Sequence, residues 1–185
     1  MINEVKQDAD HRMHSAIEAL QRELSGIRTG RAAPALVERL HVDYYGASTP
    51  LNQLAGVSAP EARMLVIQPW DRGSIGAIEK AILKSDLGLT PNSDGQVIRL
   101  SIPQLTEDRR KALVKLSKTK VEDGKVAIRN VRRDAVDHLK ALVKDKSIGE
   151  DEEHRAHDEI EKLTRQYVDD ADRLGQQKEA EITEV

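Results

Sequence analysis

Cysteine and phenylalanine are absent from this chain of 185 residues, and aromatic residues make up only 2% of it. Without cysteine the chain can form no disulfide, no thiolate nucleophile and no cysteine-ligated zinc site, which fits a reducing compartment. The aromatic residues are Tyr44, Tyr45, Trp70 and Tyr167. They are too few to favour the base-stacking surfaces that bind single-stranded nucleic acids.

Long apolar runs are also missing: a membrane-spanning helix needs about 20 apolar residues, and no run here approaches that length. The first residues include Glu4, Asp8 and Asp10, whereas a signal peptide has a basic start and an apolar middle. We therefore expect a cytoplasmic protein. The chain lacks a glycine-rich phosphate loop, a histidine pair flanking a glutamate and a serine elbow, so we expect no catalytic residue, no cofactor and no enzyme.

Two histidine pairs, His11 with His14 and His154 with His157, stand three residues apart on predicted helices. Neither pair has a third ligand at a matching turn, so solvated histidines are the favoured interpretation. The acidic residues 150–153 lack the alternating pattern and the turn glycine of a calcium loop. We expect them to stabilise a helix N-terminus, and the sequence predicts no metal site.

The main feature that is present is a helical run over residues 105–146, without proline and about 60 Å long at 1.5 Å per residue. At about 100° per residue, apolar positions gather on one side and cations on another. The predicted apolar stripe is Leu113, Leu116, Val121, Ile128, Val131, Ala135, Leu139 and Leu142. The predicted basic stripe is Lys111, Lys115, Lys118, Lys125, Arg129, Arg132, Arg133, Lys140 and Lys144.

Charge is distributed unevenly along the chain. Residues 105–146 hold 13 basic and 7 acidic residues, whereas residues 147–185 hold 5 basic and 13 acidic residues. One interpretation is that the basic helix neutralises an acidic neighbour. Because the cations lie opposite or beside the apolar stripe, we expect much of their charge to face solvent or an anionic ligand.

Two further segments have helical apolar stripes, residues 2–27 and residues 150 to near the end. The first stripe is Ile2, Val5, Ala9, Met13, Ile17, Leu20, Leu24 and Ile27, with Gly30 as the expected stop. The second is Ile160, Leu163, Tyr167, Ala171 and Leu174. Single amphipathic helices are unstable in water, so residues 1–30 and 105–185 predict a three-helix bundle. Thr106 is the expected N-cap of the long helix over residues 105–146.

Residues 31–104 have a different character and predict an inserted α+β domain. Strands are expected over residues 36–44, 64–67 and 97–102. A helix capped by Ser74 is expected over residues 74–84, with Ile75, Ile78, Ile82 and Leu83 on its apolar side. Two short crossings join this domain to the bundle. Because domain pairs with small interfaces move by default, we expect a hinge at the crossings, formed by Gly30, Arg31, Ala32, Ala33, Ile102, Pro103, Gln104 and Leu105.

Lys125, Arg129, Arg132 and Arg133 form a compact cluster on the long helix. The planar guanidinium fork of arginine can donate two hydrogen bonds to a phosphate. The alternative is that the cluster pairs with the nearby Glu122, Asp134 and Asp137. We favour phosphate, and recognition of structured RNA by its shape and backbone, because the chain has few aromatic residues for reading bases.

Five segments together resemble the ribosome recycling factor family, in the right order and at the right spacing over nearly the whole chain. They are IRTGRA (residues 27–32), YYG followed by TPL (44–51), SDLGL (85–89), LTEDRR (105–110) and VAIRNVRRDA (126–135). The resemblance implies a bacterial or organellar translation factor with an L-shaped, transfer-RNA-like outline. In it, a β/α/β domain is inserted between the first two helices of a three-helix bundle.

The resemblance further implies that the protein binds the post-termination ribosome and, with elongation factor G and its GTP hydrolysis, splits the subunits. Arg129 and Arg132 would contact large-subunit ribosomal RNA, with Arg28 and Arg31 near the bend, and the inserted domain would meet the GTPase. The candidate RNA-binding residues are Arg28, Arg31, Arg110, Lys125, Arg129, Arg132 and Arg133 in a chain expected to be a monomer.

Two positions depart from the family pattern. Gly124 stands where alanine is more frequent, which predicts a softer helix, and Val136 replaces a commonly polar residue on the basic side. Two other functions stay open at this stage. One is a helical adaptor or chaperone-type protein that binds protein through its bundle, and the other is an enzyme sited in the inserted domain.

Overall fold

The computed structural model describes residues 1–184, whose contacts divide them into two compact units. The helical unit comprises residues 1–24 and 114–180, and the sheet unit comprises residues 25–113 with the chain end from Glu181. The predicted fold class is confirmed: a small α+β unit is inserted between the first and second helices of a three-helix bundle. The contacts place residues 25–30 and 105–113 with the sheet unit, whereas the sequence grouped them with the bundle.

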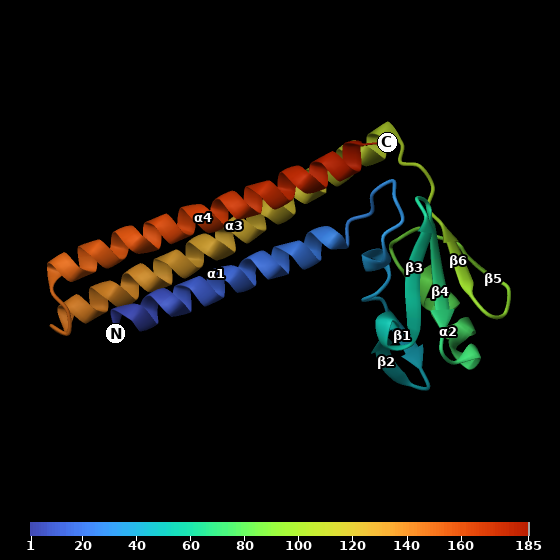
Figure 1. The fold of residues 1–185 in the computed structure, drawn as a ribbon, viewed down its shortest axis with the longest axis horizontal. Helices are drawn as coiled ribbons and strands as arrows, with labels where there is room; N and C mark the ends of the chain where they lie inside the picture. Colours follow the sequence, from blue (N-terminus) through green and yellow to red (C-terminus); the bar gives the residue numbers. More distant parts are fainter. Residues whose placement is uncertain (185) are drawn as a thin grey trace. The chain divides into compact units, whose positions relative to one another are not determined.

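The bundle consists of α1 (Ile2–Ser25), α3 (Glu107–Lys144) and α4 (Glu150–Thr183), which lie side by side in Figure 1. Six residues of the stripe predicted for α1 are buried in the helix: Val5, Ala9, Met13, Ile17, Leu20 and Leu24. Of the other two, Ile2 is half-buried, and Ile27 is buried beyond the end of the helix. The helix ends at Ser25, before the predicted stop at Gly30. No helix among residues 1–184 is both long enough and apolar enough to cross a membrane.

At the start of α3, the predicted cap is confirmed because the backbone N–H of Arg109 donates to Thr106 Oγ1 over 3.1 Å. The predicted apolar stripe of α3 is buried except for Leu116, which is 42% exposed. Ser117 is buried in its place, and its hydroxyl donates to the carbonyl of Val114 over 2.8 Å. The buried row therefore runs through residues 113, 117 and 121, and a satisfied hydroxyl occupies the position expected to be apolar.

Glycine permits two close contacts between the helices. A Cβ on Gly124 of α3 would lie 3.1 Å from Leu20 Cδ2, and a Cβ on Gly175 of α4 would lie 2.7 Å from Val121 Cγ2. The sequence predicted only the conformational cost of Gly124. The structure adds the reason for it, which is that Leu20 of α1 packs against the bare backbone.

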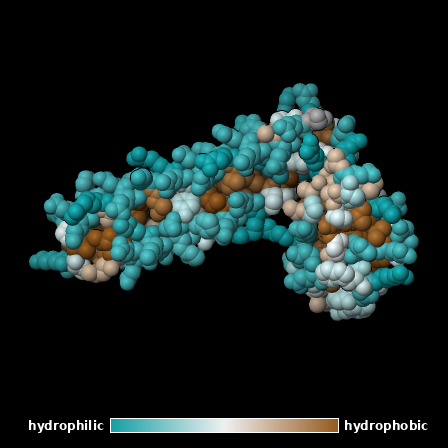
Figure 2. All heavy atoms as spheres, viewed as in Figure 1, coloured by the Kyte–Doolittle hydropathy of each residue, from teal (hydrophilic) through white to brown (hydrophobic). Residues whose placement is uncertain are grey.

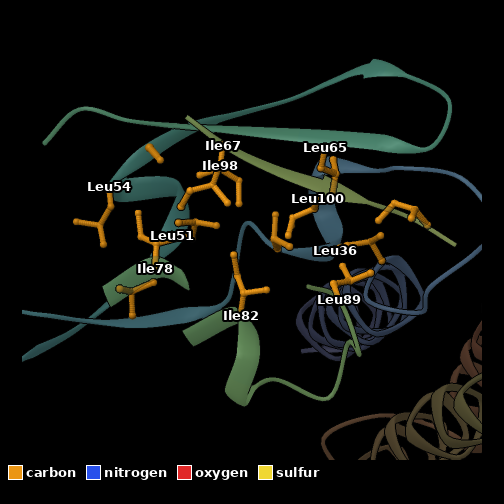
Figure 3. Close-up of a cluster of buried hydrophobic side chains, with 14 residues drawn as sticks. Leu36, Leu51, Leu54, Leu65, Ile67, Ile78, Ile82, Leu89, Ile98 and Leu100 are labelled. Atoms are coloured by element: carbon orange, nitrogen blue, oxygen red, sulfur yellow. The ribbon is translucent and has the colours of Figure 1, made fainter. Parts of the chain in front are cut away.

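In the sheet unit, four antiparallel strands pair in the order β3 (Ala55–Glu61), β4 (Met64–Pro69), β6 (Ile98–Ser101) and β5 (Pro91–Ser93). A separate hairpin pairs β1 (His41–Tyr44) with β2 (Ala47–Pro50). Side chains of the sheet, of β1 and of α2 (Ile75–Lys84) form one core. Figure 3 shows Ile67, Ile98, Leu65 and Leu100 from the sheet together with Ile78 and Ile82 from α2.

Three local predictions in this unit need correction. The strand expected over residues 36–44 is a 3₁₀ turn at Pro34–Leu36 followed by β1. Ser74 precedes α2, but its hydroxyl donates to the carbonyl of Asp71 over 2.6 Å and makes no N-cap bond. Leu83, expected on the apolar side of α2, is 63% exposed.

Candidate nucleic-acid interface

Position on the α3 wheel separates the four clustered cations. At about 100° per residue, Arg132 and Lys125 lie about 60° and 80° from the centre of the buried stripe, whereas Arg129 and Arg133 lie about 120° and 160° from it. The first two therefore border the neighbouring helix. The last two face away from the core.

Lys125 forms ion pairs with acidic residues of the bundle. Its ammonium pairs with Asp172 of α4 and lies 3.4 Å from Glu122 Oε1, and its side chain is only 15% exposed. The hydrogen bond to Asp172 raises the pKa of Lys125 above its ordinary value. For this residue the structure shows the alternative interpretation, in which a cation of the basic helix pairs with acidic neighbours.

Arg132 is partly engaged. Its Nη1 donates to Glu161 Oε1 of α4 over 3.0 Å, and its side chain is 38% exposed. His157 Nε2 lies 3.9 Å from the same carboxylate oxygen. The Nε of Arg132 is buried without a partner in the described chain, while Nη2 makes no bond within residues 1–184.

Arg129 and Arg133 are exposed, and neither side chain has a hydrogen-bond or ion-pair partner within residues 1–184. Asp134, one of the carboxylates that could have neutralised them, instead accepts a 2.9 Å hydrogen bond from Arg12 of α1. That bond raises the pKa of Arg12. Four exposed lysines that also have no side-chain partner within residues 1–184 continue this face of the helix: Lys115, Lys118, Lys140 and Lys144. We call these six residues the open row.

Arg28 has a structural position in the sheet unit. Its Nη1 donates to the carbonyl of Leu87 over 3.3 Å, and its Nη2 donates to that of Pro103 over 3.1 Å. Partial burial, and then the nearby charge of Arg109, lowers the pKa of Arg28. This guanidinium fastens the first crossing to the second.

The structure brings Arg31 and Arg110 together at a cavity of about 280 Å³ in the sheet unit. Residues from both predicted crossings also line it, among them Gly30, Gln104 and Leu105. The crossings are anchored on the β3–β4 turn, since the N–H of Ala32 donates to Ala62 O over 2.7 Å and that of Ile102 to Arg63 O over 2.8 Å. The expected hinge therefore contains two fixed backbone points.

Three of the four histidines that stood in pairs in the sequence, His14, His154 and His157, lie near carboxylates on their own helices. His14 lies 3.3 Å from Glu18, and His154 lies 3.9 Å from Asp158. Within residues 1–184, no group of three or more histidine, aspartate and glutamate side chains is arranged to hold a metal.

Sequence reasoning missed the acidic residues that shape this interface, Asp172 and Glu161 of α4 and the Asp134 contact with α1. The available signal was the angle of each cation from the apolar stripe, because cations at its edge meet the next helix. In Figure 2 hydrophilic side chains cover most of the visible face of the three helices, with apolar atoms between them. The geometry thus defines a class: a helical-bundle protein with an inserted α+β unit and an open cationic face suited to a polyanion.

Comparison with known proteins identifies the family within this class. The family model described as "Ribosome recycling factor" matches residues 20–183. The ribosome-recycling factors of Thermomicrobium roseum and Heliobacterium modesticaldum are 56% and 57% identical to this chain, over the full length of both chains in each case. The chain belongs to the ribosome recycling factor family.

Two solved structures are similar throughout. A solution structure of the ribosome recycling factor matches with a TM-score of 0.79 at 42% identity, covering 100% of this chain and 98% of the other. A model of the Thermus thermophilus factor, described with Escherichia coli elongation factor G on the E. coli post-termination complex, matches with a TM-score of 0.70 at 48% identity and full coverage of both chains. These matches agree with the predicted fold.

Proposed function

We propose that this protein binds the post-termination ribosome and, together with elongation factor G, splits it into subunits. The GTP hydrolysis belongs to the partner, and this chain acts in the cytoplasm as a monomeric, noncatalytic factor. Family membership and the relative described on a post-termination complex support the proposal. So does the open row, because exposed guanidinium and ammonium groups on one helix suit a phosphate backbone.

The observation that carries the RNA-binding role is the freedom of Arg129 and Arg133. Each guanidinium can offer two parallel donors to a phosphate without first leaving a carboxylate. We assign them to large-subunit ribosomal RNA, recognised by shape and backbone. A rigid helix that presents its donors in advance loses little conformational entropy on binding.

The other predicted RNA-binding residues have graded roles in this proposal. Arg132 keeps Nη1 on Glu161 and offers Nη2 to phosphate. Arg31 and Arg110 form a second, smaller contact at their shared cavity. Lys125 and Arg28 act from within the protein, because Lys125 holds α4 and Arg28 holds the two crossings together.

We also propose that the crossings act as a hinge, with Ala32 and Ile102 as the fixed points on the sheet unit. Gly30→Pro would stiffen the first crossing and is expected to impair subunit splitting more than ribosome binding. Gly30→Ala is the control, because no atom lies within 4 Å of the Cβ it would add. Equal splitting by the proline variant would rule out the hinge.

The direct experiment is sedimentation of the purified chain with ribosomal subunits at two salt concentrations, with and without elongation factor G and GTP. Binding through phosphates should weaken steeply with salt, because each neutralised phosphate releases condensed counterions. If the chain were instead a helical adaptor that binds protein through apolar contacts, its binding would be equally strong at both salt concentrations. Splitting without elongation factor G would contradict the partner assignment.

A further inference from the structure

Three side chains of different character meet where α3 borders α4. Arg132 Nη1 donates to Glu161 Oε1 over 3.0 Å, and His157 Nε2 lies 3.9 Å from the same oxygen. His157 and Glu161 stand four residues apart on α4, so their side chains share one face of that helix. One carboxylate oxygen therefore has two neighbours that can donate to it, a guanidinium and an imidazole.

The bond between Arg132 and Glu161 uses only part of the guanidinium. Nη1 alone donates to the carboxylate, and Nε is buried without a partner in the described chain. A bidentate pair would use two parallel donors. With one bond made and one buried donor unsatisfied, this pair is weaker than a bidentate one, so a second cation can compete for Glu161.

On its own helix, His157 has carboxylates one turn to either side. Glu153 and Glu161 stand four residues before and after it, and both are half-buried. They are the acceptors that α4 offers to a protonated imidazole. α1 packs on another side of α4, because its Lys6 pairs with Glu159, about 160° of rotation from His157.

On the α3 side, the charges near His157 are cations. The pair of Arg132 with Glu161 sets the register of the two antiparallel helices, and one turn further this register places Val136 opposite His157. Arg132 and Lys140 stand four residues to either side of Val136. The side chain of His157 is 36% exposed, so water can still exchange a proton with it.

We propose that His157 is a positioning residue for Arg132: protonated His157 binds Glu161, and Arg132 is then free to bind a phosphate of the RNA. Neutral His157 leaves Glu161 to Arg132, as in the structure. Histidine is the side chain that ordinarily changes charge between about pH 5 and pH 8. The inference rests on the proposed ribosome binding and adds a proton that sets how many phosphates α3 can contact.

The sign of the effect follows from the charges of the three side chains. With neutral His157, the positive charge of Arg132 and the negative charge of Glu161 cancel. Protonation of His157 leaves one positive charge in excess, and it acts beside the open row. Ribosome binding should therefore strengthen as the pH falls, and one more neutralised phosphate should steepen its salt dependence by about 0.7–0.9.

The first test uses no ribosome. NMR of the isotope-labelled full chain follows the ring of His157 and the Nε–H of Arg132 from about pH 8 to about pH 5.5. We expect the Arg132 signal to shift with the same midpoint as the ring, and we expect this shift to disappear in His157→Gln. An Arg132 signal that stays constant while His157 titrates would overturn the inference, whether or not the chain binds ribosomes.

The second test compares ribosome binding at about pH 7.5 and about pH 6. From the higher to the lower pH, binding by the parent should strengthen about two- to fivefold more than binding by His157→Gln. His154→Gln is the matched control, because His154 also lies 3.9 Å from a carboxylate four residues on, that of Asp158, but is 78% exposed. It should keep the parental pH response. Equal responses of the parent and His157→Gln would contradict the inference and leave the proposed function intact.

Glu161→Gln provides a second, independent variant. It removes the carboxylate charge for which Arg132 and His157 compete, so at about pH 7.5 it should bind ribosomes as tightly as the parent does at about pH 6. Its pH response should match that of His157→Gln. A parental pH response in Glu161→Gln would refute the inference, since a merely structural role of His157 would lower the thermal midpoint without changing the pH profile.

Failure of the proposed function would look different. In that case neither the parent nor the variants would bind ribosomes at either pH, and the NMR titration alone would decide whether His157 and Arg132 exchange at Glu161.

Discussion

Arg129 and Arg133 differ from Lys125 and Arg132 in surroundings although all four lie within nine residues of one helix. The first two are exposed without a partner in the described chain, whereas the other two contact carboxylates of α4. About 60° of rotation on the helix decides between these outcomes, because cations at the edge of the buried stripe reach the next helix. The comparison shows that one basic stripe contains two kinds of cation, those open to solvent and those paired with the next helix.

The largest effect should come from removing the two open arginines. Arg129→Ala combined with Arg133→Ala is expected to weaken ribosome binding about 10- to 100-fold at 0.1 M salt, because two charge-assisted contacts are lost. Sedimentation or fluorescence titration with labelled protein measures this. Arg165→Ala is the matched control, since Arg165 is an exposed arginine of α4 without a partner within residues 1–184. If it costs as much as the double variant, the open row has no special role.

Lys125→Ala should show the opposite behaviour. It leaves Asp172 unpaired at a helix contact, and we expect the free energy of unfolding to fall by about 1 kcal/mol while ribosome binding changes less than about threefold. Urea unfolding of the full chain gives the first quantity. Lys162→Ala changes an exposed lysine of α4 that has no partner within the described residues 1–184, and it should leave unfolding unchanged. A Lys125 variant with normal stability and weak binding would reverse our assignment.

Glu161→Gln tests the intermediate case, Arg132. Glutamine can still accept from Nη1, but the loss of the negative charge weakens that contact and raises the local positive potential, so ribosome binding should strengthen about two- to fivefold. Asp169→Asn removes the same charge from an exposed position of α4 and should have little effect. Weaker binding by Glu161→Gln would show that the carboxylate positions Arg132 for RNA, in place of withholding it.

An effect of similarly small size is expected at the hydrogen bond between α4 and α1. The hydroxyl of Tyr167 donates to Asp10 Oδ1 over 2.6 Å, and burial followed by this bond raises the pKa of Tyr167 to about 12. Tyr167→Phe should lower the free energy of unfolding by about 0.5–1 kcal/mol at neutral pH.

The pH dependence of that difference has a definite sign. Because the folded pKa of Tyr167 is raised above an unfolded value of about 10, the stabilisation is complete below pH 10 and is lost as the pH rises towards 12. The unfolding free energies of the parent and the Tyr167→Phe protein should therefore converge over this window. A difference that stays constant from pH 8 to pH 12 would show that the phenol makes no such bond.

Much of the fold follows from periodicity and caps in the sequence. The buried rows of α1 and α3 and the Thr106 cap depend on spacing within one segment, which the sequence displays directly. Strand β3 was missed because it contains Gly56 and Pro60, which read as turn residues but are tolerated at the edge of a sheet. Leu116 was misplaced because Ser117, with its hydroxyl satisfied on the preceding turn, could replace an apolar side chain in the seam.

The candidate site was only half predictable. Residue type and spacing identified all four cations, and the angle of each from the apolar stripe could have separated the two at its edge from the two that face away. The carboxylate that each edge cation meets depends on the register of α4 against α3, which places Asp172 beside Lys125 and Glu161 beside Arg132 and which no local pattern encodes. Arg28 shows the same limit, since its carbonyl partners lie 59 and 75 residues away in the chain.

The salt dependence of ribosome binding tests the central claim most directly. The logarithm of the association constant falls as the logarithm of the salt concentration rises. The slope for the parent should be steeper than that for the Arg129→Ala, Arg133→Ala variant by about 1.4–1.8, the value for two phosphate contacts. Lys125→Ala should keep the parental slope. Identical slopes for the parent and the double variant, or an equal loss of slope in Lys125→Ala, would contradict the division of α3 into open and paired cations.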